Sequence, residues 1–151
     1  ELEKNGVLAF VPIGNSMWPT LKNRKQTIIV AKKTQKLKHF DVALFQRENG
    51  EYILHRVMQT TDDGYITCGD SQFRLETVLE SAVIGVMTGF YRGKKFIDVN
   101  DEEYLKEVKK YCLEALKIKG IAWKRSSILF KKNCSIFTLR HFSIKNLQSV
   151  I

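Results

Sequence analysis

The sequence has no long hydrophobic run, and this absence excludes a transmembrane helix of the ordinary kind. A helix needs about 20 mainly apolar residues to cross a bilayer, and no such stretch occurs in the chain. Residues 1–16 also lack the basic start and apolar core of a secretory signal peptide. Internal repeats, low-complexity segments and a recognisable helix-turn-helix are missing as well. We therefore expect a globular chain without a membrane span.

Cysteine and histidine are scarce, which argues against a metal centre. The three cysteines, Cys68, Cys112 and Cys134, are odd in number, widely spaced and without a CxxC pair. His39 and His141 have no carboxylate or thiol neighbour at metal-ligand spacing. We expect reduced, mostly buried thiols, a reducing compartment, and no metal or other cofactor.

Apolar residues, in contrast, are frequent enough to form a core. Hydrophobic residues make up 44% of the chain and include nine Phe and five Tyr. Short β-branched and aromatic runs occupy residues 7–13, 27–31, 41–46, 51–58, 82–91 and 95–99. Turn-forming residues separate many of them: Asn49-Gly50, Asp62 to Gly64, Gly89 and Gly93. The pattern predicts a mainly β fold, with an antiparallel sheet forming a partly closed barrel.

The pattern changes at Asn100, where we expect a helix to begin. Asn100 with Glu103 three residues later is typical of a capping box, and apolar residues then recur at helical spacing. The stripe predicts an amphipathic helix of about five turns. Residues 121–151 mix aromatic with basic residues, and we expect further helix there. The predicted organisation is a β domain over residues 1–99 and a basic, helical C-terminal extension over residues 100–151.

Positive charge is concentrated in this extension. Residues 1–100 hold 14 Lys and Arg against 11 Asp and Glu, giving +3, whereas residues 101–151 hold 11 against 5, giving +6. A basic excess favours an anionic partner, although a merely solvated surface gives the same count. Aromatic and basic residues at 121–145 permit attachment to an anionic membrane surface. We rank membrane or protein contact above nucleic acid, and expect a cytoplasmic or peripheral membrane location.

Residues 14–21, Gly-Asn-Ser-Met-Trp-Pro-Thr-Leu, form the segment with the clearest chemistry. Small turn-forming residues precede Ser16, and Pro19 prevents a helix from continuing. A serine on a sharp turn can act as a nucleophile when a base removes its proton and N–H donors stabilise the oxyanion. Most serines in turns only form the turn, so the segment alone does not decide its role.

The chain resembles type I signal peptidases and the related LexA-like autoproteases in segments that occur in the family's order. These are GNSMWPTL at 14–21, HFDVALFQ at 39–46, LHRV at 54–57, ITCGDSQ at 66–72 and VIGVM at 83–87. Two depart from the family pattern: His39-Phe40 replace a usual Gly, and Ser71-Gln72 replace the x-Asn that usually follows Gly-Asp. The resemblance covers about residues 7–90 and implies the partly closed barrel of that superfamily.

The resemblance implies a serine peptidase site with Ser16 as nucleophile and His55 as general base. Bacterial members use a lysine where this chain has His55, so it is similar to the archaeal and endoplasmic-reticulum branch. Asp70 is the candidate that orients His55 and stabilises its imidazolium form. Its altered neighbours leave open that Asp70 only holds a turn. Asp41 is its competitor, which we interpret as structural.

The residues around Ser16 supply the expected oxyanion and substrate contacts. We expect the Ser16 N–H to bind the oxyanion, with the Asn15 amide as a second candidate. Met17 and Trp18 are candidates for lining a substrate groove, and core packing suits Met17 equally well. The predicted function is a serine endopeptidase that removes leader or signal-type peptides. The alternative is a catalytically silent or self-cleaving LexA-like regulatory module, although no Ala-Gly cleavage pair precedes the segment.

Overall fold

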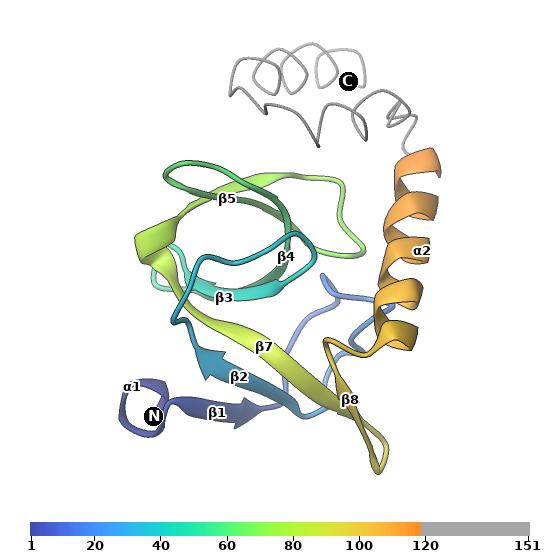
Figure 1. The fold of residues 1–151 in the computed structure, drawn as a ribbon, viewed down its shortest axis with the longest axis horizontal. Coiled ribbons are helices and arrows are strands. Elements are labelled where there is room, and N and C mark those ends of the chain that lie inside the picture. The colour runs from blue at the N-terminus through green and yellow to red at the C-terminus, as the bar shows by residue number, and fades with distance from the viewer. Residues whose placement is uncertain (119–151) are drawn as a thin grey trace. The chain divides into compact units, whose positions relative to one another are not determined.

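The computed structural model describes residues 1–118, and in this part of the chain most of the ordered structure is β (Figure 1). The helices and strands are α1 Leu2–Asn5, β1 Val7–Phe10, β2 Ile28–Lys32, β3 Val42–Gln46, β4 Tyr52–Thr60, β5 Gly64–Cys68, β6 Glu76–Leu79, β7 Val83–Arg92, β8 Lys95–Asp98 and α2 Glu102–Ile118. A short 3₁₀ turn, Glu80–Ala82, joins β6 to β7. All the strand pairs of this region are antiparallel, so the predicted mainly β, antiparallel fold is confirmed.

The sheet curls but does not close into the predicted barrel. Its strand order is β1-β2-β7-β3-β4-β5-β6, with β8 paired to β7. Within the described residues, β1 and β6 therefore end the sheet and each has one strand partner. β3 and β6 are connected through side chains and not through a backbone ladder. Arg47 lies just after β3, and its Nε atom is 2.6 Å from Glu76 Oε1 on β6. The predicted partly closed barrel is not formed. The sequence pattern of each strand does not show which strands far apart in the sequence pair with each other.

Turn chemistry positions the hairpins largely as the sequence predicted. Gly50 has a φ of 85° and donates its N–H to the Arg47 carbonyl at 2.9 Å in the turn between β3 and β4. Gly93 has a φ of 65° between β7 and β8. Gly89, in contrast, lies inside β7 and forms no turn. A Cβ there would collide with the Phe96 ring, so glycine is required for packing.

The C-terminal helix α2 begins later than the predicted cap. Asn100 donates both its N–H and its side-chain amide to Asp98 Oδ1, at 2.7 and 2.9 Å. Asn100 thus forms a turn with Asp98, and α2 begins at Glu102. The helix ends at Ile118, and no helix in the described region is long and apolar enough to cross a membrane. Residues 119–151, including the basic segment 121–145, lie outside the described residues.

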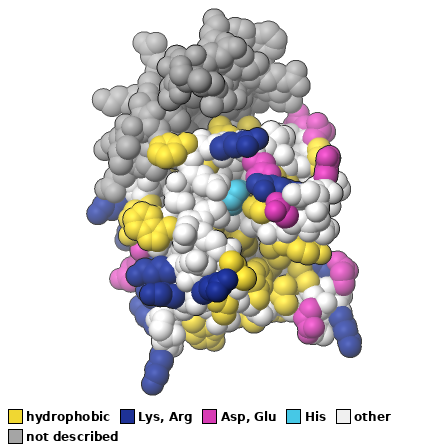
Figure 2. All heavy atoms as spheres, turned by 180° about the vertical axis from the view of Figure 1, so that it is seen from behind, with side chains coloured by type: hydrophobic (Ala, Val, Ile, Leu, Met, Phe, Trp, Pro, Cys, Tyr) yellow, Lys and Arg dark blue, Asp and Glu magenta, His cyan; other side chains and the backbone are white. Residues whose placement is uncertain are grey.

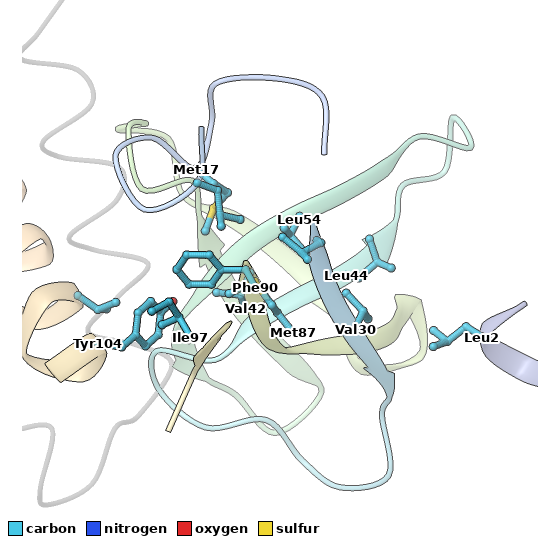
Figure 3. Packing of buried hydrophobic residues seen from close by; sticks show 13 residues of the cluster. Leu2, Met17, Val30, Val42, Leu44, Leu54, Met87, Phe90, Ile97 and Tyr104 are labelled. Atoms are coloured by element: carbon cyan, nitrogen blue, oxygen red, sulfur yellow. The ribbon is translucent and has the colours of Figure 1, made fainter. Parts of the chain in front are cut away.

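Two hydrophobic clusters form the core. The first joins both N-terminal and C-terminal segments to the sheet, and Figure 3 shows Met17 after β1 and Tyr104 of α2 among its members. Tyr104 meets the Phe90 ring edge-on, with centroids 5.7 Å apart. The second cluster lies inside the curl of the sheet and contains Ala43, Phe45, Val57, Tyr65, Val78 and Val83. The compact unit of residues 1–115 therefore includes most of α2.

Replacing Val108 with alanine tests how far α2 stabilises the β sheet. Val108 is 1% exposed in the first cluster, so Val108→Ala should lower the free energy of unfolding by about 1.5–3 kcal/mol in urea titrations. The matched control, Lys110→Ala, changes an exposed side chain of the same helix and should stay within about 0.5 kcal/mol. Equal stability of the two variants would contradict this packing.

Candidate active site

Ser16 lies in a hydrogen-bonded turn that follows β1. The Trp18 N–H donates to the Asn15 carbonyl at 3.0 Å, and the Gly14 N–H donates to Asn23 Oδ1 at 3.0 Å. Gly14 has a φ of 117°, a conformation that strongly favours glycine. These contacts hold Ser16 half-buried, with a defined backbone direction.

The loop after β5 packs directly against the Ser16 turn. The Ser71 N–H donates to the Ser16 carbonyl at 2.9 Å, and the Ser71 hydroxyl donates to the Asn15 carbonyl at 2.8 Å. A Cβ on Gly69 would lie 2.6 Å from the Ser16 carbonyl oxygen and 3.0 Å from the Ser16 Cβ. Glycine at this position lets the loop approach Ser16 closely. The predicted segments 14–21 and 66–72 therefore meet in the structure.

His55 lies on β4, beside the position where this loop leaves the sheet. The last Cα partners of β4 and β5 are Arg56 and Cys68, which are adjacent in sequence to His55 and Gly69. A Cβ added to Gly69 would collide with Ser16, so Ser16 lies against that side of Gly69. Ser16 thus contacts the residue that directly follows Cys68, and Cys68 is paired with Arg56, the neighbour of His55 in sequence.

The His55 imidazole is buried, with 3% of the residue exposed. Its ring meets Phe45 edge-on, and its Nδ1 atom lies 3.6 Å from Glu76 Oε2. Burial lowers the pKa of His55, the charge of Glu76 raises it, Arg47 lowers it and Asp70 raises it. Burial has the largest effect, so the neutral imidazole, which is the form that accepts a proton, is favoured.

Asp70 is bound by other partners than His55. Arg56 donates from Nε to Asp70 Oδ1 at 2.7 Å and from Nη2 to Asp70 Oδ2 at 2.6 Å. The Thr20 hydroxyl also donates to Oδ2, at 2.6 Å. Burial alone would lower the pKa of the Arg56 guanidinium, but the charge and hydrogen bonds of Asp70 outweigh it and raise this pKa. The orienting role of Asp70 stays a prediction, and its contacts here tie the Ser16 turn to β4.

Sequence reasoning missed Glu76, the carboxylate nearest to a His55 nitrogen among the contacts of the described residues. Glu76 lies at the start of β6, outside all the segments that carry the resemblance. No local motif marks it, because β6 itself has no clear alternation of apolar and polar residues. Asp41, the competitor of Asp70, accepts the Lys38 N–H at 2.7 Å and so forms a turn, as interpreted from the sequence.

An apolar groove of about 570 Å³ extends from Ser16 between the β1 side of the sheet and the β3–β4 hairpin. Its lining includes Leu8, Phe10, Pro12, Ile13, Met17, Leu44, Tyr52, Ile53, Leu54 and Ile84. Figure 2 shows a face of the molecule on which hydrophobic side chains gather beside acidic and basic ones. Met17 is 5% exposed and belongs to both groove and core, whereas Trp18 is 57% exposed.

The Ser16 backbone N–H donates no hydrogen bond within the described residues, so it is available to an incoming oxygen. The side chain of Asn15, the second oxyanion candidate, is exposed. Within residues 1–118, no three His, Cys, Asp or Glu side chains gather as a metal site would require. Comparison with protein-family models, curated proteins and solved structures gave no match. The resemblance to signal peptidases therefore rests on the sequence segments alone.

Removing the Asp70 carboxylate should destabilise the protein strongly. Asp70→Ala leaves the buried Arg56 cation without its partner, and we expect a loss of about 3–5 kcal/mol in the free energy of unfolding. Urea titration measures it, with Asp62→Ala, an exposed aspartate, as a control that should change by about 0.5 kcal/mol or less. If Asp70→Ala were as stable as this control, Asp70 would not have the structural role inferred from its contacts.

Proposed function

We propose that this protein is a serine endopeptidase of the signal-peptidase and LexA-like type, which cleaves leader or signal-type peptides. Ser16 is the nucleophile and His55 the general base. The observation that carries the proposal is the contact of Ser16 with Gly69, the residue that follows the last β5 partner of β4, next to the strand position of His55. The order of the resembling sequence segments supports the same pair of residues.

The bonds and protons of the reaction can be balanced with these side chains, the substrate and water. The Ser16 Oγ attacks the scissile carbonyl carbon while His55 takes its proton, and the Ser16 N–H stabilises the oxyanion. The tetrahedral intermediate collapses, the C–N bond breaks, and His55 gives its proton to the leaving amine. Water then attacks the acyl ester, with His55 again taking and returning a proton. The carboxylic acid leaves and Ser16 is regenerated.

Two free backbone edges beside the groove support binding of the substrate as an added strand. β1 ends the sheet, with β2 as its one strand partner in the described region. On the other side of the groove, β4 pairs with β5 only from Arg56 onward, which leaves an edge of residues 52–54 without that ladder. An extended peptide between these edges can form main-chain hydrogen bonds, and the apolar lining suits apolar side chains.

An active-site probe distinguishes this peptidase from a silent regulatory module of the same superfamily. A fluorophosphonate should form an adduct at Ser16, located by mass spectrometry, and Ser16→Ala should abolish it with no change in the fold. His55→Ala should slow labelling about 100-fold or more, because the base is removed. Ser81→Ala, which removes an exposed hydroxyl elsewhere, is the control and should label normally. An unlabelled wild-type protein would refute the proposal in favour of the silent module.

The pH dependence of labelling provides a second test. Only neutral His55 can accept the Ser16 proton, so the rate should fall as the pH drops through the pKa of His55. Because burial lowers this pKa, the midpoint should lie below the ordinary histidine value of about 6.5. The midpoint of this pH dependence is measured from the rates of probe labelling between about pH 4 and pH 8, which includes the range in which histidines titrate. A midpoint above the ordinary value would contradict a buried, neutral base.

A further inference from the structure

We propose that Glu76 is the positioning residue for His55, and that Arg47 holds Glu76 in place for this task. The inference rests on the proposed function, in which His55 is the general base. Its basis is the 3.6 Å approach of Glu76 Oε2 to His55 Nδ1. A general base of this type needs a group that fixes its orientation and stabilises its charged form.

The buried Nδ1 atom of His55 needs such a partner. Nδ1 is inaccessible to solvent and has no hydrogen-bond partner within the described residues. A buried polar atom left in this state costs about 1–3 kcal/mol. At 3.6 Å the Glu76 oxygen is too far for a hydrogen bond, but catalytic hydrogen bonds are often long before substrate binds. A small closure of β6 toward β4 would satisfy both groups.

Arg47 fixes the carboxylate and keeps it ionised. The guanidinium donates from Nε to Glu76 Oε1 at 2.6 Å and from Nη2 to Glu76 Oε2 at 2.8 Å, which is the two-pronged geometry of a strong pair. These hydrogen bonds lower the pKa of Glu76. Oε2 retains acceptor capacity, since a carboxylate oxygen accepts from more than one donor. Glu76 can therefore accept from His55 without leaving Arg47.

The other charged groups around His55 do not compete for this role. Asp70, in the loop after β5, is bound by Arg56, whose side chain projects to the face of β4 opposite to that of His55. Arg47, just after β3, is a cation and cannot accept a proton from His55. With Nδ1–H directed to Glu76, the lone pair of Nε2 is the one left to take the Ser16 proton.

Nuclear magnetic resonance of the imidazole nitrogens tests the inference independently of catalysis. In the wild-type chain, neutral His55 should carry its proton on Nδ1. Glu76→Gln should move the His55 titration to lower pH, because an anion that stabilises the imidazolium is lost. Glu51→Gln is the matched control: Glu51 accepts from the same Arg47, at 3.3 Å, but is exposed and is not among the charges that shift the His55 pKa. It should leave the titration unchanged.

Probe labelling adds the catalytic readout. Glu76→Gln should slow Ser16 labelling by on the order of 100-fold, Glu76→Asp should recover part of the rate, and Glu51→Gln should stay within about twofold of wild type. If Glu76→Gln left the His55 titration and proton position unchanged, the inference would be overturned, even with a reactive Ser16. An altered titration with an unreactive wild-type Ser16 would uphold the His55–Glu76 contact and refute the peptidase. A loss of stability alone, with normal titration and labelling, would reduce Glu76 to a structural role.

Discussion

The arrangement of the site depends on the hydrogen bonds of the buried Arg56 guanidinium. Arg56 is 0% exposed and binds the Asp70 carboxylate, the Phe40 carbonyl at 2.9 Å and the Tyr104 hydroxyl at 3.5 Å. Through Asp70 it also reaches Thr20, in the turn that carries the nucleophile candidate. A buried cation is tolerated only when its donors are satisfied. One side chain of β4 therefore fixes the Ser16 turn, the loop after β5 and the first turn of α2 together.

The alternation of β4 places the Arg56 cation and the candidate base His55 on opposite faces of the strand. Arg56 and His55 are adjacent in sequence, so their side chains project to opposite faces of the strand. Arg56 contacts Tyr104 of the first core cluster, whereas His55 meets Phe45 of the second. The Asp70 carboxylate is bound by Arg56, on the face of β4 opposite to that of His55. Strand geometry gives a physical reason for two carboxylates with different tasks, one on each face.

Features that depend on local chemistry could be predicted from the sequence, and those that depend on distant pairing could not. The hairpin at Gly50 follows from a turn signal between two β-rich runs, and the α2 stripe follows from helical spacing. The Thr20–Asp70 hydrogen bond and the proximity of Ser16 to Gly69 each join residues about fifty positions apart. Only the resemblance suggested that these segments belong together. Glu76 had neither a local motif nor a place in the resemblance.

The missing closure of the sheet is also the feature that the proposed binding of a peptide substrate depends on. A closed sheet has no free edges, whereas within residues 1–118 β1 has one strand partner and residues 52–54 of β4 lack the β5 ladder, and both segments line the groove. An unpaired strand edge can pair with another chain and so promote aggregation. β1 has only four residues, and such a short edge limits this pairing. Val7 and Ile13 keep apolar side chains 48% and 76% exposed near this edge, where the proposed substrate strand would cover them. Under the proposed function, an open edge would be an expected cost, because a bound substrate strand would itself extend the sheet.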